Sequence, residues 1–105
     1  MSHVRSDQPE RSDMACLRAF AREGSQDAFA TLVRRRIDMV YSAALRQVRD
    51  PATAEDVAQG VFMTLARKAA GLVDRNVVLS AWLLRATHLA ALDALRRERR
   101  RQKGR

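Results

Sequence analysis

The hydrophobic positions that follow Ser25 have the spacing of one buried helical face. Apolar side chains recur every three or four residues, which is the pattern of an amphipathic α-helix. Ser25 is a favourable N-cap, and Asp50–Pro51 ends the helix because the residue before proline is pushed out of the α region. The predicted buried stripe consists of Phe29, Leu32, Val33, Ile37, Val40, Tyr41, Ala44, Leu45 and Val48.

One further helix is predicted on each side of it in the sequence. The earlier helix runs through "MACLRAFARE"; Ser12 or Asp13 can cap it, and it stops at Gly24, a common C-terminal residue. In the later helix Thr53 is the predicted cap and Gly71 the predicted end. The inward stripe of this third helix consists of Val57, Val61, Leu65 and Ala69.

The segment "GLVDRNVVLS", residues 71–80, lacks helical periodicity. We expect a loop of about eight residues there, which is longer than most helix connections and therefore a candidate for function. A fourth helix begins near Ser80 and continues through "AWLLRATHLAALDALRRERR". Its first half is apolar almost all round and is predicted to be largely buried, whereas its second half is almost entirely charged.

These patterns predict an all-α fold, a compact bundle of about four helices with a long basic C-terminal helix. Aromatic residues make up only 5% of the 105-residue chain, while Ala, Leu, Val and Arg dominate, which favours helices over sheets. The expected organisation is a disordered polar N-terminus at residues 1–11, one helical domain at 12–101 and a basic tail at 102–105.

The positive charge of the chain is concentrated at its C-terminal end. The formal net charge is +8, and the last ten residues, "RRERRRQKGR", hold seven Arg or Lys against one Glu. Such a block favours a polyanionic partner, either nucleic acid or an anionic membrane surface, although a solvated basic tail has the same composition. The single Cys, the lack of an apolar run long enough to span a membrane and the polar start indicate the cytoplasm.

The outward face of the third helix combines unusual residue types. At 100° per residue, Asp56, Gln59, Gly60, Met63 and Arg67 lie opposite the buried stripe. A glycine inside a helix costs about 1 kcal/mol relative to alanine. The face is either the solvated side of an amphipathic helix or a protein-docking surface, and Gly60 beside Met63 favours docking.

Arginines follow one side of the fourth helix. Arg85, Arg96 and Arg100 fall within about 60° of one another on a helical wheel, an arrangement that can follow a phosphate backbone. Asp93 can orient Arg96 and Arg97 through pairs three and four residues apart. The competing interpretation is ordinary solubilising charge.

No residue pattern predicts catalysis or a metal site. The chain has no nucleophile beside a base, no paired acids in a pocket pattern and no glycine-rich phosphate loop, so we expect a binding protein and not an enzyme. His88 has no partner at metal-ligand spacing, and no cofactor is implied. Trp82 is either a core residue or a stacking platform for an unpaired base.

Three segments, "VYSAALRQVRD", "AEDVAQGVF" and "WLLRATHLAALDALRRERRR", occur in the order and spacing of a known family. Together they resemble region 2 of bacterial RNA polymerase sigma factors of the extracytoplasmic-function (ECF) group, over approximately residues 27–101. The resemblance implies a domain that binds core RNA polymerase and recognises and melts the minus-ten promoter element by capturing single-stranded non-template DNA. Sigma factors of this group are also commonly held by an anti-sigma factor.

The resemblance assigns two sets of residues. The third helix would dock on the clamp helices of the largest polymerase subunit; with Gly60 and Met63 added from the same face, the predicted set is Glu55, Asp56, Gln59, Gly60 and Met63. A loop of about residues 73–79 would form a pocket for a flipped base, and the fourth helix would follow the DNA. The predicted DNA-binding set is Asp74, Arg75, Asn76, Ser80, Trp82, Arg85, His88, Arg96, Arg97 and Arg100.

The sequence departs from the family pattern at three points. Gly60 replaces a residue that is often acidic, and His88 stands where Asn is common. The chain also ends after the basic run, without the second helical domain that reads the minus-thirty-five element, so weak binding to polymerase and DNA is expected. Two alternatives are a small helical nucleic-acid-binding protein unrelated to polymerase, and an interaction module whose basic tail binds an acidic partner.

Overall fold

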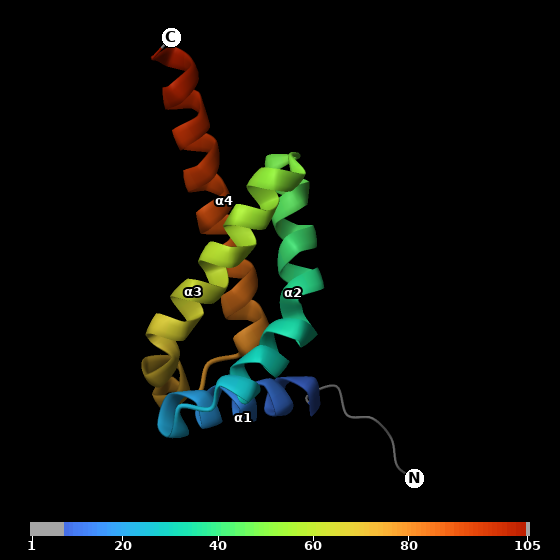
Figure 1. Cartoon of the computed structure of the whole chain (residues 1–105), viewed down its shortest axis with the longest axis vertical. Coiled ribbons are helices and arrows are strands. Elements are labelled where there is room, and N and C mark those ends of the chain that lie inside the picture. The colour runs from blue at the N-terminus through green and yellow to red at the C-terminus, as the bar shows by residue number, and fades with distance from the viewer. Residues whose placement is uncertain (1–7, 105) are drawn as a thin grey trace.

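The computed structural model describes residues 8–104, and its elements are four helices (Figure 1). These are α1 (Gln8–Glu23), α2 (Gln26–Val48), α3 (Pro51–Arg75) and α4 (Leu79–Lys103). The prediction of an all-α bundle with a long basic C-terminal helix is confirmed. No helix within the described residues combines the length and the hydrophobicity that crossing a membrane requires.

The predicted hydrophobic stripes meet in one core. Helices α2, α3 and α4 run side by side, and α1 lies across one end of them (Figure 1). The inward stripe of α3 is buried throughout, and the α2 stripe is either buried or packed against the core. The largest fully buried apolar side chains are Leu17, Leu32, Val40, Val61, Leu65, Leu72, Leu79 and Leu83.

The predicted N-cap of α2 is confirmed, and the predicted N-cap of α3 is wrong. Ser25 caps α2 as expected, since its side chain accepts a hydrogen bond from the N–H of Ala28 at 3.1 Å. At α3, however, the cap is Asp50 and not Thr53: Asp50 Oδ2 accepts from the Thr53 N–H at 2.9 Å and from the Thr53 hydroxyl at 2.7 Å. Pro51 suits the first helical position because it lacks the N–H that would be unpaired there.

Helix α1 begins at Gln8, four residues before the predicted domain boundary at residue 12. Residues 8–11 therefore belong to a helix, and the rest of the predicted disordered N-terminus lies outside the described residues. Asp13 is not a cap but a fully buried side chain. It pairs with Arg35 Nε at 2.8 Å and also with Arg36, so burial of this ion pair sets the position of α1 on α2.

Helix α3 continues past Gly71 to Arg75, and the predicted eight-residue loop shrinks to residues 76–78. Asn76 ends the helix in the left-handed conformation (φ 52°) and donates its N–H to the carbonyls of Leu72 and Val73. Both of these residues are buried. Their packing outweighs the weak helical pattern of the segment, and Asn tolerates the left-handed C-terminal position that glycine often occupies.

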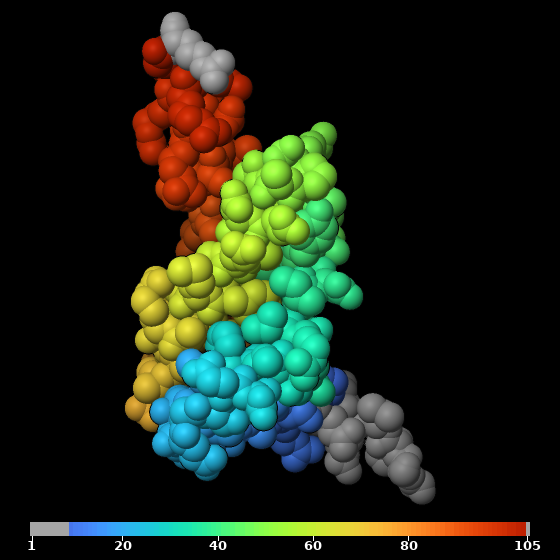
Figure 2. All heavy atoms as spheres, viewed as in Figure 1, coloured from blue at the N-terminus to red at the C-terminus, as the bar shows by residue number. Residues whose placement is uncertain are grey.

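The two halves of α4 differ in their surroundings. In the first half only one face is buried, because Leu84 and Leu89 are 42% and 56% exposed; the prediction of a largely buried first half is therefore wrong. The second half extends beyond the α2–α3 corner and stands clear of it (Figure 2). The helix reaches Lys103, so part of the predicted basic tail is helical.

Candidate functional site

The outward face of α3 is exposed as the sequence pattern predicts. Glu55, Asp56 and Gln59 are exposed, Gly60 is partly exposed, and Met63 is 63% exposed. Apart from the two neighbouring residues and the adjacent backbone of α3, no heavy atom of the described residues lies within 4 Å of the point where a Cβ would stand at Gly60. The fold therefore leaves open space at this glycine.

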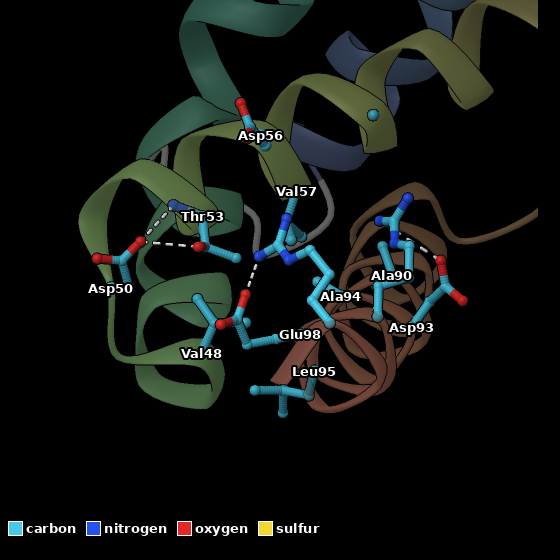
Figure 3. Close-up of a pocket in the computed structure, with 13 residues that line it drawn as sticks. Val48, Asp50, Thr53, Asp56, Val57, Ala90, Asp93, Ala94, Leu95 and Glu98 are labelled. Atoms are coloured by element: carbon cyan, nitrogen blue, oxygen red, sulfur yellow. Dashed lines mark hydrogen bonds and ion pairs between the residues drawn. The ribbon is translucent and has the colours of Figure 1, made fainter. Parts of the chain in front are cut away.

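One side of this face borders a cleft of about 870 Å³, here called the acidic cleft. Its walls are the α2–α3 corner and the second half of α4 (Figure 3). It is lined by Val48, Asp50, Thr53, Asp56, Val57, Gly60, Ala90, Asp93, Ala94, Leu95, Arg97, Glu98 and Arg101. The lining thus combines an apolar floor with four carboxylates and two guanidinium groups.

Pairing within the acidic cleft leaves Asp56 as its available carboxylate. Arg97 Nη2 lies 3.5 Å from Asp93, and Arg101 pairs with Glu98 (Figure 3). Asp50 is occupied as the cap of α3, and the hydrogen bonds from the Thr53 hydroxyl and N–H lower the pKa of its carboxyl. Asp56 forms no ion pair or side-chain hydrogen bond with any residue between 8 and 104, so its charge is free to meet a partner.

A second hollow, the basic pocket, opens between α3 and the first half of α4. Its volume is about 450 Å³, and it is lined by Gly60, Val61, Thr64, Lys68, Arg75, Trp82, Arg85, Ala86, Leu89 and Ala90. Three of these residues are cations and none is acidic. Trp82 is half-buried and packs against the core as well as lining the pocket, so it fits both interpretations given to it from sequence.

The acidic cleft and the basic pocket share two residues. Gly60 of α3 and Ala90 of α4 line both hollows. Gly60 has no side chain and Ala90 only a methyl group, so neither residue fills the space where the two hollows adjoin. Two surfaces of different charge therefore adjoin on one pair of helices.

The short linker between α3 and α4 contributes little to the basic pocket. Asp74, Arg75 and Asn76 are exposed, and of these only Arg75 lines the pocket. A linker of residues 76–78 differs from the expected eight-residue loop that would enclose a base. The basic pocket lies between α3 and α4 instead.

The arginines at the end of α4 divide into two groups. Arg96 and Arg100 line a shallow depression of about 170 Å³ together with Arg99 and Lys103. Arg97 faces the acidic cleft on another side of the helix, and it is Arg97 that pairs with Asp93. Arg85 belongs to the basic pocket, so the predicted stripe consists of two separate cationic sites.

Two remaining residues of the predicted DNA-binding set have partners inside the protein. His88 is exposed, and its Nδ1 lies 2.8 Å from Oε1 of Gln47 on α2. Ser80 lies in the first turn of α4, where its N–H donates to Glu10 at 3.3 Å. Across the described residues, no group of three or more His, Cys, Asp or Glu side chains is arranged to hold a metal ion.

Lys68 and Leu89 line the basic pocket but are missing from the residues proposed on sequence grounds. A signal for Lys68 was present in the pattern. Thr64, Lys68 and Arg75 follow one another at intervals of four and seven residues, which places them on one side of a helix. The predicted end of α3 at Gly71 separated Arg75 from this row.

Comparisons with known proteins show the family to which the chain belongs. The family model for sigma-70 region 2 matches residues 32–101. The chain is 37% identical over 78 residues to RNA polymerase sigma factor CarQ of Myxococcus xanthus, covering 74% of this chain and 44% of CarQ. It is 35% identical over 92 residues to ECF RNA polymerase sigma factor SigK of Mycobacterium ulcerans (strain Agy99), covering 86% of this chain and 49% of SigK.

The chain spans a little under half the length of these curated relatives. No solved structure gives a significant match. The family match covers two thirds of the chain, from α2 to the basic end of α4, and so includes both hollows. The chain belongs to the sigma-70 region 2 family, as the region 2 domain of an ECF sigma factor.

Proposed function

We propose that this domain binds core RNA polymerase through α3 and captures single-stranded promoter DNA in the basic pocket. The observation that carries the proposal is the pair of adjoining hollows, one with the unpaired Asp56 and the other with three cations around Trp82. Opposite charges suit two different partners. Membership of the sigma-70 region 2 family supports assigning polymerase and promoter DNA as these partners.

The polymerase contact uses the exposed face of α3. Asp56 supplies a free carboxylate, Gln59 an amide and Met63 an adaptable apolar surface. A basic partner on the polymerase clamp would form charge-assisted hydrogen bonds with Asp56, each contributing about 1.5 to 3 kcal/mol. The open space at Gly60 lets the backbone of that partner approach α3 closely.

The DNA contact uses the basic pocket. A base removed from the duplex loses its stacking, and an aromatic side chain restores about 1 to 3 kcal/mol per base in proteins that bind single strands. Trp82 offers that surface, while Lys68, Arg75 and Arg85 surround the pocket with charges for the phosphates. Capture of the minus-ten base in this pocket offsets the energy of melting without ATP hydrolysis.

The duplex beside the melted region lies along the end of α4. Arg96 and Arg100 are exposed and line one depression with two further cations. Such contacts release counterions from the DNA without reading its sequence. They hold the domain on the duplex while the basic pocket reads a single strand.

The experiment is a fluorescence titration with a single-stranded minus-ten oligonucleotide and a scrambled oligonucleotide at the same salt concentration. We expect the wild-type domain to bind the minus-ten sequence more tightly than the scrambled one, and Arg85→Ala to bind the minus-ten oligonucleotide more weakly than wild type. Arg67→Ala is the matched control, because Arg67 is an exposed arginine of α3 that lines neither hollow. Equal binding of both oligonucleotides by the wild-type domain would contradict the promoter-reading role.

A further inference from the structure

Glu10 of α1 connects the first turn of α4 to the rest of the bundle. Its Oε1 accepts a hydrogen bond from the backbone N–H of Ser80 at 3.3 Å, across 70 positions of sequence. Its Oε2 lies 3.6 Å from Nη2 of Arg36 on α2. One carboxylate group therefore joins three helices.

Helix α4 has no side-chain cap of its own. Val78 occupies the N-cap position, forms no side-chain cap hydrogen bond and is followed by a first turn without acidic residues. The first N–H groups of a helix have no partner within the helix, and a negative charge beside them is stabilised by the helix dipole. Glu10 supplies both the acceptor and the charge from another helix.

A second ion pair keeps α1 in place for this contact. Asp13, three residues after Glu10, is fully buried and pairs with Arg35 and Arg36. Removing a buried carboxylate from such partners leaves uncompensated charge, which opposes detachment of α1. The sigma-70 region 2 match begins at residue 32, so both acids lie outside the matched segment.

We propose that Glu10 is a positioning residue for DNA binding, a role that rests on the function proposed above. Ser80 stands two residues before Trp82, and the short linker 76–78 ends directly before α4. Fixing the first turn of α4 fixes Trp82 relative to Lys68 across the basic pocket. Glu10 acts through the Ser80 N–H and does not itself contact DNA.

The test compares Glu10→Gln with the control Glu23→Gln, which makes the same change on the same helix. Glu23 is exposed, and its side chain has no hydrogen bond or ion pair with residues 8–104. In Glu10→Gln, hydrogen exchange of the Ser80 amide should accelerate by roughly fivefold, as expected from the loss of a capping carboxylate. The fluorescence of Trp82, the single tryptophan of the chain, should change as well.

The binding measurements separate positioning from general stability. In Glu10→Gln the affinity for the minus-ten oligonucleotide should fall by about threefold or more, while core-polymerase affinity stays within about twofold of wild type. Glu23→Gln should change neither. Because Gln keeps an amide oxygen that can accept from the Ser80 N–H, this variant tests the charge of the cap, and unaltered Ser80 exchange would overturn the role of that charge. Accelerated exchange with unaltered oligonucleotide affinity would overturn the positioning role.

The same measurements distinguish failure of this inference from failure of the proposed function. If the wild-type domain shows no preference for the minus-ten oligonucleotide, the promoter-reading function fails and the DNA role of Glu10 fails with it. The cap itself is decided by Ser80 exchange, which needs no DNA. Far-UV circular dichroism of both variants checks that the helices are intact.

Discussion

The acidic cleft and the basic pocket are built by the same two helices, yet they present opposite chemistry. In the cleft, arginines pair with neighbouring acids and Asp56 is left over. In the pocket, the lining includes the cations Lys68, Arg75 and Arg85 and no acid. The difference follows the order of charges along α3, which has Glu55 and Asp56 near its start and Lys68 and Arg75 toward its end.

Gly60 of α3 and Ala90 of α4 mark the place where these two surfaces adjoin. Both residues line both hollows, so a partner in one hollow lies near a partner in the other. Under the proposed function, protein and nucleic acid would bind on adjoining sides of one helix pair. The comparison predicts that substitutions in one hollow change one partner's affinity and spare the other's.

Among the substitutions that test the two hollows, reversal of the charge at Asp56 should cause the largest change in affinity. In Asp56→Arg a basic partner meets repulsion in place of a charge-assisted hydrogen bond, so core-polymerase affinity should fall by more than about tenfold. The measurement is a pull-down or titration with core enzyme. Asp38→Arg is the control, because Asp38 is an exposed acid of α2 outside both hollows. If Asp56→Arg still binds core polymerase, the face of α3 around Asp56 is not the polymerase-binding surface.

Substitution of the arginines at the end of α4 should have the next largest effect, on the salt dependence of DNA binding. The double variant Arg96→Ala/Arg100→Ala should lower the slope of log affinity against log salt for duplex DNA by about 2, since each phosphate contact contributes close to one. The variant Arg97→Ala/Arg101→Ala removes the same charge but affects arginines already paired with Asp93 and Glu98. Its slope should change less. Equal slopes for the two variants would mean that the side of α4 on which an arginine lies does not affect its contact with duplex DNA.

Substitution of Gly60 should have a smaller effect, raising the stability of the domain and lowering its affinity for polymerase. Gly60→Ala should raise the free energy of unfolding by about 1 kcal/mol, because alanine is the better helix former and its Cβ meets open space. If Gly60 admits the polymerase backbone, the same change should weaken core-polymerase binding. Gly71→Ala is the matched control, since Gly71 also lies inside α3 with open space around it. Gly71→Ala should stabilise the domain without altering polymerase affinity. If the two variants have the same polymerase affinity, Gly60 has no role in polymerase binding.

The smallest effect concerns the pH dependence contributed by the α3 cap. The hydrogen bonds from Thr53 lower the pKa of Asp50 in the folded state, so its contribution to stability is complete above the unfolded-state pKa of about 3.9. The contribution is lost as the pH falls through the lowered folded-state value. Thermal melts of wild type and Asp50→Ala should therefore differ at pH 7 and converge in acid. A difference that persists at low pH would show that the carboxylate is not the stabilising group.

Much of the fold followed from residue spacing alone. The stripes of α2 and α3 and the cap at Ser25 were predictable because periodicity and capping chemistry are local. The start of α1 and the C-terminal end of α3 were not. Asp13 reads locally as a cap and is buried because Arg35 and Arg36 come to it from α2, a tertiary contact with no local signature.

The candidate site was predictable in its residue types more than in its geometry. The exposed face around Asp56 followed from the helical wheel, and the cationic character of α4 followed from composition. The basic pocket depends on how α3 and α4 pass each other, so Lys68 could not be assigned to it before the path of α3 beyond Gly71 was known. Glu10 is further from prediction still, because its partner Ser80 is 70 positions away.

The most direct test of two separate surfaces is a crossed titration of Asp56→Arg and Arg85→Ala against core polymerase and the minus-ten oligonucleotide. We predict that Asp56→Arg loses polymerase affinity and keeps oligonucleotide affinity, and that Arg85→Ala does the reverse. Circular dichroism of both variants verifies folding. If either substitution lowers the affinity for polymerase and for the oligonucleotide equally in a folded protein, the acidic cleft and the basic pocket do not bind separate partners.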